Sequence, residues 1–437
     1  MIVVEHGFNC STMQKFKSAI RTSEKVLLLA LLVSAFAGCS PKLGYEGRTH
    51  ELSVTAVYPE GSAQWAREGV EVVFEDAVSG TDYVALTDGN GTARILLPNG
   101  SYGVRISDIA VDSETGDEYV FNGAQEKVIL VDGDRSVTVN LTRSIPGKIV
   151  IREIYSSGCP RFPLEGTYQA DKYIVLHNNS MVQQHLDGLC FGVVDPYNST
   201  ASNVWITRDS GSGQIVYTDF VPVIQAVWQF PGSGHEHPLN PGEDAVLVVG
   251  GAIDHTSEYP LSVNLNNSAY FVCYNNVAFW NPAYHPAPGD RIQSDHIMEL
   301  LLKMGQANAF TFSINSPAVV LFRPVDGMTM TEFLQNQDNI VQKPGSSADR
   351  IVKVPLEWVE DGVEVFTSNV SGSTKRLNPV LDAGYVRLTE TFQGRALYRR
   401  VNEAETQKRG YEVLMDTNNS SADFYESDRN GQSLRKK

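Results

Sequence analysis

The densest group of side chains that could do chemistry is His235-Glu236-His237, with His255 further along the chain. Two imidazoles at positions i and i+2 of a strand point to the same face, and a third could complete a zinc site. Gly and Pro residues flank the group, however, and a loop does not enforce that geometry. A polar loop is therefore the favoured interpretation, and a metal-dependent hydrolase using His235, His237 and His255 is the alternative function.

Other arrangements with chemical potential are weaker. A carboxylate beside a histidine, as in Asp254-His255, can tune a base near neutral pH, but strand neighbours point to opposite faces, which favours a buried hydrogen-bonding role. The acidic pair Glu360-Asp361 precedes Gly362 and predicts a turn. There is no G-x-S-x-G nucleophile motif and no phosphate-binding glycine loop. We therefore expect no catalytic residues, no cofactor and no enzymatic activity.

An aromatic-rich loop is the better candidate for a binding site. Residues 275–286 carry Phe279, Trp280 and Tyr284 after an apolar strand expected at 269–274. Trp and Tyr on irregular backbone often form contact surfaces for sugars or protein partners. The alternative, slightly favoured by the sequence, is that these rings plug the protein core.

The positioning elements are mostly strands. Residues 149–155, 172–177 and 189–194 are β-branched or apolar runs separated by Gly, Pro and Asn. Glu153-Ile154, the segment from Asp171 to Asn178, and Leu186-Asp187-Gly188 occur in an order that resembles the lamin-tail domain, an immunoglobulin-like β-sandwich. The resemblance implies that the closing strands pair with the opening ones, which would bring Glu153 and Asp423 into one folded unit. Helical patches are expected at 329–334 and 347–353.

Residues 48–145 are expected to form a separate, small β domain. Thr87-Asp88-Gly89-Asn90-Gly91 and Leu97-Pro98-Asn99-Gly100 are turn sequences between short strands. They resemble the carboxypeptidase-regulatory, prealbumin-like sandwich, which implies a spacer without a site. Pro146-Gly147 breaks the last strand of this region and marks the boundary to a second domain at 148–434.

The N-terminus carries a targeting signal. A basic region precedes an apolar run, 26–37, that is too short to span a bilayer. Phe36-Ala37-Gly38-Cys39 resembles a bacterial lipobox, which implies a signal peptide of residues 1–38, starting at Met1 or Met13, and a lipid on Cys39. Residues 39–47 would be a tether. Each buried methylene of the acyl chains adds about 0.8 kcal/mol of membrane affinity, so the expected location is the cell envelope.

Taken together, these features resemble the Bacteroidota lipoprotein family catalogued as domain of unknown function 4876. The matches include Asn240-Pro241-Gly242-Glu243 and the segment 416–424. The family has no established activity, so the resemblance implies an architecture. That architecture is a prealbumin-like β-sandwich followed by a larger, lamin-tail-like one with insertions.

Composition limits the partners. The formal charge of −16 disfavours nucleic acid, which needs a basic face.

Besides Cys10 and Cys39, the cysteines are Cys159, Cys190 and Cys273. Cys159 and Cys190 are the preferred disulfide pair, and three buried free thiols are the alternative.

The sequence thus predicts a non-catalytic envelope lipoprotein that binds a ligand or a protein partner. Lipoproteins of this lineage often work beside TonB-dependent outer-membrane transporters, so such a transporter is the expected partner by association. The residues after Cys39 lack an acidic run, which favours the periplasmic face of the outer membrane over the cell surface.

Overall fold

The computed structural model describes residues 48–66, 68–111, 118–211, 214–325, 327–429 and 434. The expected signal peptide, Cys39 and the tether lie outside the described residues. From Thr49 on, the described chain forms one compact unit. The predicted division into domains at 145–148 stays a prediction. No helix among the described residues has the length and apolar composition needed to cross a bilayer.

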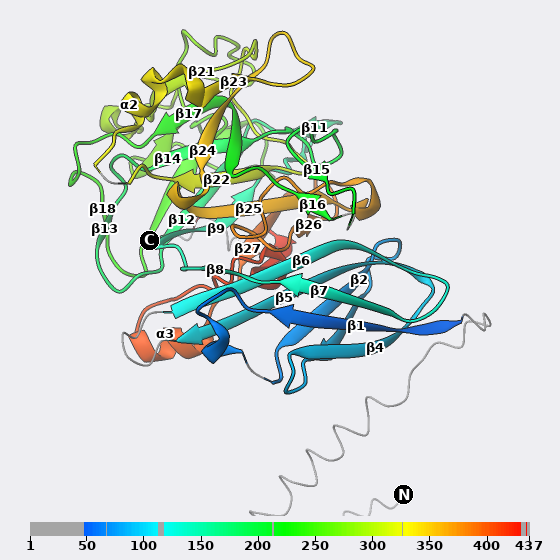
Figure 1. Cartoon of the computed structure of the whole chain (residues 1–437). Helices are drawn as coiled ribbons and strands as arrows, with labels where there is room; N and C mark the ends of the chain where they lie inside the picture. The colour runs from blue at the N-terminus through cyan, green and yellow to red at the C-terminus, as the bar shows by residue number, and fades with distance from the viewer. Residues whose placement is uncertain are drawn as a thin grey trace, which may run out of the picture. The chain divides into compact units, whose positions relative to one another are not determined.

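Residues 49–144 form two sheets, drawn in blue and cyan in Figure 1. One has the order β4-β1-β7, and the other has the order β3-β2-β5-β6-β8. Their strands are β1 (Thr49–Val57), β2 (Glu71–Asp76), β3 (Asp82–Leu86), β4 (Thr92–Pro98), β5 (Gly100–Val111), β6 (Glu118–Leu130), β7 (Arg135–Asn140) and β8 (Thr142–Ser144).

Strand β5 shows how the sequence fixes the two faces of the five-stranded sheet. Tyr102, Val104 and Ile106 are fully buried in a core shared with β1 and β4. Because side chains alternate along a strand, Ser101 and Arg105 project from the opposite face. That outer face is covered by residues from the second half of the chain, as described below.

Residues 149–428 form a six-stranded sheet, β20-β19-β12-β9-β27-β28, and an eight-stranded sheet with the path β23-β24-β17-β14-β22-β25-β26 and β21 beside β17. The strands are β9 (Ile149–Tyr155), β12 (Tyr173–Asn178), β14 (Cys190–Val194), β17 (Phe220–Gln229), β19 (Asp244–Val248), β20 (Tyr270–Val272), β21 (Glu299–Lys303), β22 (Ala318–Phe322), β23 (Ile340–Gln342), β24 (Arg350–Pro355), β25 (Val359–Thr367), β26 (Val386–Leu388), β27 (Arg395–Arg399) and β28 (Phe424–Asp428).

Short pairs and helices complete the unit. The pairs are β10 (Cys159–Pro160) with β11 (Thr167–Tyr168), β13 (Gln184–His185) with β18 (Pro238–Leu239), and β15 (Thr207–Arg208) with β16 (Ile215–Val216). The helices are α2 (Met330–Gln335), α3 (Glu403–Arg409) and α4 (Ser420–Asp423).

The two large sheets pack as a sandwich. Ile154 and Leu176 of the six-stranded sheet share one buried cluster with Trp228, Leu321 and Val363 of the eight-stranded sheet. Burial of such side chains contributes about 1.5–3 kcal/mol each, so this contact stabilises the sandwich. The mostly β, sandwich fold that the sequence predicts is confirmed.

The predicted closure of the chain on its start is also confirmed. Strand β27 pairs antiparallel with β9, with Leu397 opposite Ile154 and Tyr398 opposite Glu153. Strand β28 then pairs with β27 at the sheet edge, with Arg399 opposite Phe424. The last 40 or so residues are therefore needed to complete the sheet that residues 149–155 begin.

Two local predictions are wrong and one is confirmed. The helix expected at 347–353 is instead strand β24, and the turn expected at Glu360-Asp361 lies inside β25. Both segments are held in register by long-range pairing that outweighs local preference. The helix expected at 329–334 exists as α2, with a capping box between Thr329 and Glu332.

Candidate functional site

The aromatic loop that follows β20 has an anchored base. Phe279 is fully buried and its ring stacks on Trp228, with centroids 6.0 Å apart. Its N–H donates to Asn275 O at 2.9 Å, and Asn275 N donates to Nε2 of the buried His285 at 3.1 Å. Burial lowers the pKa of His285 to about 4, so the ring is neutral and accepts this bond.

The tip of the same loop faces solvent. Trp280 is 66% exposed and Tyr284 is 50% exposed. Asn281 lies between them and accepts backbone N–H groups of Ala283 and His285. Of the three predicted contact residues, Phe279 thus plugs the core, and Trp280 and Tyr284 are exposed on a hydrogen-bonded loop. Their role in binding stays a prediction.

The predicted histidine cluster does not assemble. His235 packs against His185, with ring centroids 4.8 Å apart, while His237 contacts Phe271 and His296. Among the described residues, no group of three or more His, Cys, Asp or Glu side chains could hold a metal ion. The alternative of a hydrolase using His235, His237 and His255 therefore has no metal site in this part of the chain.

The loop that carries His235 and His237 is built around two carboxylates. Asp187 accepts the N–H groups of Gly234, Glu236 and His237 at 2.9–3.2 Å. The Glu236 side chain folds back on its own loop and accepts the N–H groups of residues 233–235. These bonds explain a polar loop, which is the interpretation that the sequence favours.

His255 has the buried hydrogen-bonding role expected for it. The side chain is 2% exposed, with Nδ1 2.7 Å from Tyr168 Oη and Nε2 2.6 Å from Gly251 O. Its neighbour Asp254 turns away and caps a short 3₁₀ helix by accepting Thr256 N–H. The two side chains therefore do not form a catalytic pair.

The cysteines are buried free thiols in the structure, which corrects the predicted Cys159–Cys190 disulfide. Cys159 lies with its sulfur 3.7 Å from Asp171 Oδ2. Cys190 lies on β14, where its sulfur contacts Gly188 O and Gln229. Each sulfur is thus directed to a partner of its own. Cys273 is fully buried in the sandwich core.

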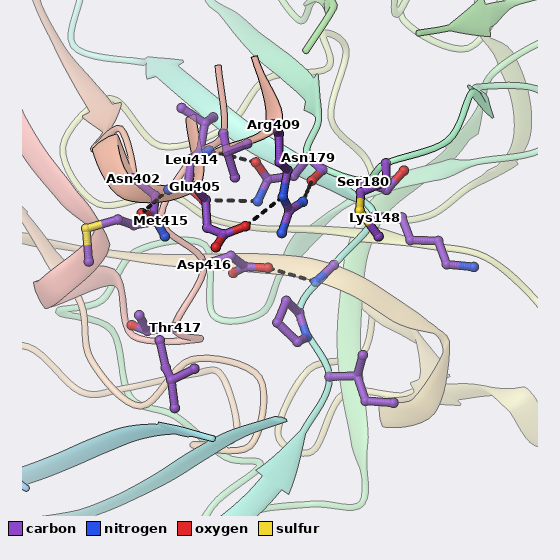
Figure 2. Close-up of a pocket in the computed structure, with 16 residues that line it drawn as sticks. Lys148, Asn179, Ser180, Asn402, Glu405, Arg409, Leu414, Met415, Asp416 and Thr417 are labelled. Carbon is purple, nitrogen blue, oxygen red and sulfur yellow. Dashed lines mark hydrogen bonds and ion pairs between the residues drawn. The ribbon is translucent and has the colours of Figure 1, made fainter. Parts of the chain in front are cut away.

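A small pocket of about 240 Å³ lies beside α3, between residues 145–148 and the segment 413–417. Figure 2 shows its polar side chains pointing toward one another. Asn179 exchanges two hydrogen bonds with the backbone of Leu414, at 2.7 and 3.0 Å. Arg409 donates to Asn179 O and to Glu405. These hydrogen bonds hold the C-terminal segment against the start of the sandwich, so the pocket residues have a structural role.

A buried charge cluster missed by the sequence analysis lies next to this pocket. Arg399 Nη2 is 2.6 Å from Asp361, and Nη1 is 2.9 Å from Asp416. Asp423 is the third carboxylate, 3.7 Å from Nη1. Asp416 also accepts Gly147 N–H at 2.7 Å (Figure 2). The family-like segment 416–424 therefore carries structural carboxylates, a role that its Asp spacing alone does not reveal.

Comparison with solved structures finds a protein with a similar fold. The chain is similar to the crystal structure of a DUF4876 family protein from Bacteroides thetaiotaomicron VPI-5482, with a TM-score of 0.54 and 23% identity, covering 86% of this chain and 94% of that one. This likeness shows the fold.

Two further matches are weak. A DUF3823 family protein from Parabacteroides merdae ATCC 43184 has 12% identity and a TM-score of 0.16, covering 42% of this chain and 92% of that one. A streptococcal ancillary pilin has 18% identity and a TM-score of 0.16, covering 46% and 54%. No curated protein matches the sequence.

The family comparison points to the same relatives. Residues 240–430 match the family described as protein of unknown function, DUF4876. They include Asn240-Pro241-Gly242-Glu243 and the segment 416–424, which are two of the motifs on which the sequence resemblance rests. The resemblance is therefore confirmed: this region matches the DUF4876 family, and most of the chain has the fold of a member of that family.

Proposed function

We propose that this protein is a non-catalytic binding protein of the cell envelope, anchored by a lipid on Cys39. The proposed binding role is supported by the aromatic loop. Trp280 and Tyr284 are exposed at its tip, and Phe279 and His285 are buried at its base. Exposed aromatic rings on a fixed backbone lose little conformational entropy when a partner covers them. The proposed partner is another envelope protein, with a TonB-dependent outer-membrane transporter as the specific candidate.

The loop is suited to protein contact because its backbone is already ordered. Asn281 N donates to Asn308 O at 2.9 Å, which ties the tip to a neighbouring segment. Asn275 accepts the N–H groups of Val277 and Ala278 in the first turn. Hot spots of protein interfaces are enriched in Trp and Tyr surrounded by less important contacts. Val277, which is 87% exposed, would add apolar area on the same loop.

Affinity isolation from the cell envelope tests the partner. Full-length protein should recover a defined envelope protein, identified by mass spectrometry, and the Trp280→Ala, Tyr284→Ala double variant should lose it. The matched control is Phe162→Ala with Leu164→Ala, which removes two side chains that are 59% and 61% exposed elsewhere. Equal recovery with wild type and the Trp280/Tyr284 variant would refute the contact surface, and recovery of no envelope protein would refute the partner.

The lipid anchor has its own test. Cys39→Ser should move the protein from the membrane fraction to the soluble fraction and abolish incorporation of labelled fatty acid, because the thiol is the attachment point. A membrane-bound, unlabelled variant would contradict lipidation at Cys39. Elemental analysis of protein purified without a His tag tests the hydrolase alternative, since bound stoichiometric zinc would reopen it.

A further inference from the structure

A pocket larger than the one beside α3 lies on the outer face of the five-stranded sheet. Its volume is about 500 Å³, within the range of about 300–1,000 Å³ typical of ligand sites. Strand β5 contributes Ser101, Gly103 and Arg105 to one wall because alternate residues share a face. The opposite wall comes from residues 366–385, which include Phe366 of β25 and Tyr385 before β26.

A buried brace holds the two walls together. The Glu75 carboxylate is 2% exposed and accepts hydrogen bonds from Arg105, Tyr385 and Arg387. Burial favours the neutral acid, but Arg105, Tyr385 and Arg387 together outweigh it and lower the pKa of Glu75. Glu75 is therefore an ionised acceptor whose charge is already matched by the brace itself.

The brace is also sterically specific. Arg387 Nη2 donates to Gly80 O at 2.9 Å, and a Cβ at Gly80 would lie 2.6 Å from the Arg387 guanidinium. Gly80 has a φ of +65°, a conformation that side chains other than glycine rarely adopt. Tyr385 stacks on Phe366 with ring centroids 4.0 Å apart. The pocket walls are thus fixed without a ligand.

The charge of the lining is opposite to that of the whole chain. Four of the lining residues are basic and one, Glu75, is acidic, whereas the protein carries a formal charge of −16. Lys127 and Arg208 are exposed at the pocket, and Lys375 is 4% exposed. A concave surface of one sign concentrates ligands of the opposite sign.

Two acidic side chains, Asp82 and Asp382, lie around the pocket. Asp82 lies 3.4 Å from Arg105 Nη2 but is about half exposed. Asp382 faces Lys375 and accepts N–H and hydroxyl donors from Ser420. Lys375 Nζ donates to the Gly384 carbonyl at 2.8 Å, which leaves two of its three N–H donors uncommitted by that bond.

Uncommitted donors point to an oxygen-rich ligand. The buried Nε–H of Arg105 has no partner among the described residues. Hydroxyl side chains of Ser101 and Thr374 line the same space. Buried polar groups are normally hydrogen-bonded, so a wall with spare donors suits a ligand that brings acceptors.

We propose that this pocket binds a small oxyanion, a ligand bearing carboxylate, phosphate or sulfate groups. Lys127 and Arg208 attract the anion at the entrance, and Lys375 and the hydroxyl groups donate to its oxygens. The brace of Glu75, Arg105, Tyr385 and Arg387 keeps the site open. This site is separate from the aromatic loop, so either proposal can fail without the other.

Calorimetric titration of the full-length protein with citrate and with inorganic phosphate, at constant ionic strength, tests the proposal. Wild type should show saturable binding of at least one probe. The Lys127→Gln, Arg208→Gln double variant should bind about tenfold more weakly, because two positive charges that attract the anion are removed. Both side chains are exposed, so the variant should keep the thermal midpoint of wild type.

The matched control removes one lysine and one arginine elsewhere. Arg94→Gln with Lys408→Gln changes net charge equally at side chains that are 51% and 75% exposed. It should bind the probe within twofold of wild type. Equal weakening by the two double variants would reduce the effect to general electrostatics and overturn the site. Absence of saturable binding of both probes to wild type would overturn it as well.

Discussion

Arg399 of β27 reaches Asp361 of β25, joining the two sheets of the large sandwich through a pair whose side chains are both 2% exposed. Removing one partner of a buried pair leaves an uncompensated charge and costs about 3–5 kcal/mol. Arg399 holds three such carboxylates, so we expect Arg399→Met to lower the free energy of unfolding by at least that amount. Urea denaturation followed by circular dichroism measures it.

The control for Arg399 is an arginine in an exposed ion pair. Arg94 contacts Asp88 with side chains 51% and 38% exposed, and such pairs contribute less than about 1 kcal/mol. Arg94→Met should therefore leave the urea midpoint almost unchanged. A similar loss in both variants would contradict a special role for the buried cluster.

The same cluster predicts a pH dependence. Burial raises the pKa of Asp423 to about 7, and Asp416 adds to the rise despite the attraction of Arg399. Burial likewise raises the pKa of Asp361 to about 6. Because the folded carboxyl holds its proton at a pH where the unfolded one has lost it, its contribution to stability is full below about pH 4 and declines as pH rises to about 7.

Asp423→Asn isolates this contribution. The free energy of unfolding of wild type, measured relative to the variant, should fall between pH 4.5 and pH 7.5. The amide keeps the size of the side chain but does not titrate, so the difference between the two curves reports Asp423 itself. A difference that is flat, or that rises with pH, would contradict the raised pKa.

The buried His285 predicts the opposite dependence. Burial lowers its pKa to about 4 from an ordinary 6.5, so the folded protein disfavours the charged ring. Its contribution is present above pH 6.5 and is lost as pH falls toward 4. Wild type should therefore lose more stability than His285→Gln between pH 7 and pH 4.5, measured by urea titration. Parallel losses in the two proteins would count against His285 as the anchor of the aromatic loop.

The three buried cysteines should be free thiols. Burial raises the pKa of Cys159 to about 12, with Asp171 adding to the rise, so the reactive thiolate is scarce in the native state. Cys159, Cys190 and Cys273 should resist a thiol reagent in native buffer and all react in denaturant without reductant. A Cys39→Ser variant that lacks residues 1–38 contains only these three cysteines, so it gives a clean count of reactive thiols. In the lipidated protein, the lipid blocks the Cys39 thiol. Reaction of one thiol instead of three in denaturant would show that two of these cysteines form a disulfide.

Local patterns predicted most strands, and long-range contacts account for the failures. Residues 149–155 are mainly β-branched or apolar and form strand β9 with the expected bounds. Asp361 looked like a turn residue because its partner Arg399 lies 38 positions away. The positive charge of Arg399 makes the buried charge of Asp361 tolerable within a strand. Local sequence carries no information on a partner that is so far away along the chain.

Of the two candidate sites, one could be recognised from local sequence and the other depends on long-range contacts. The aromatic loop is contiguous in sequence, so composition alone identified it, although only the structure separates the buried Phe279 from the exposed Trp280. The oxyanion pocket joins Glu75 to Tyr385 across 310 positions. Neither residue stands out locally, and only the folding of residues 366–385 over the outer face of β5 brings them together.

Phe279 and Trp280 are adjacent in sequence but should respond oppositely to truncation. Phe279 is fully buried against Trp228, and removal of a buried Phe ring costs about 3–5 kcal/mol through lost contacts and a cavity. Trp280 is 66% exposed, so Trp280→Ala should change the free energy of unfolding by less than about 0.5 kcal/mol. Urea denaturation of the two variants gives both values. A large loss for Trp280→Ala would place that ring in the core and remove it from the proposed contact surface, whereas a stable Phe279→Ala would contradict the anchored base on which the surface depends.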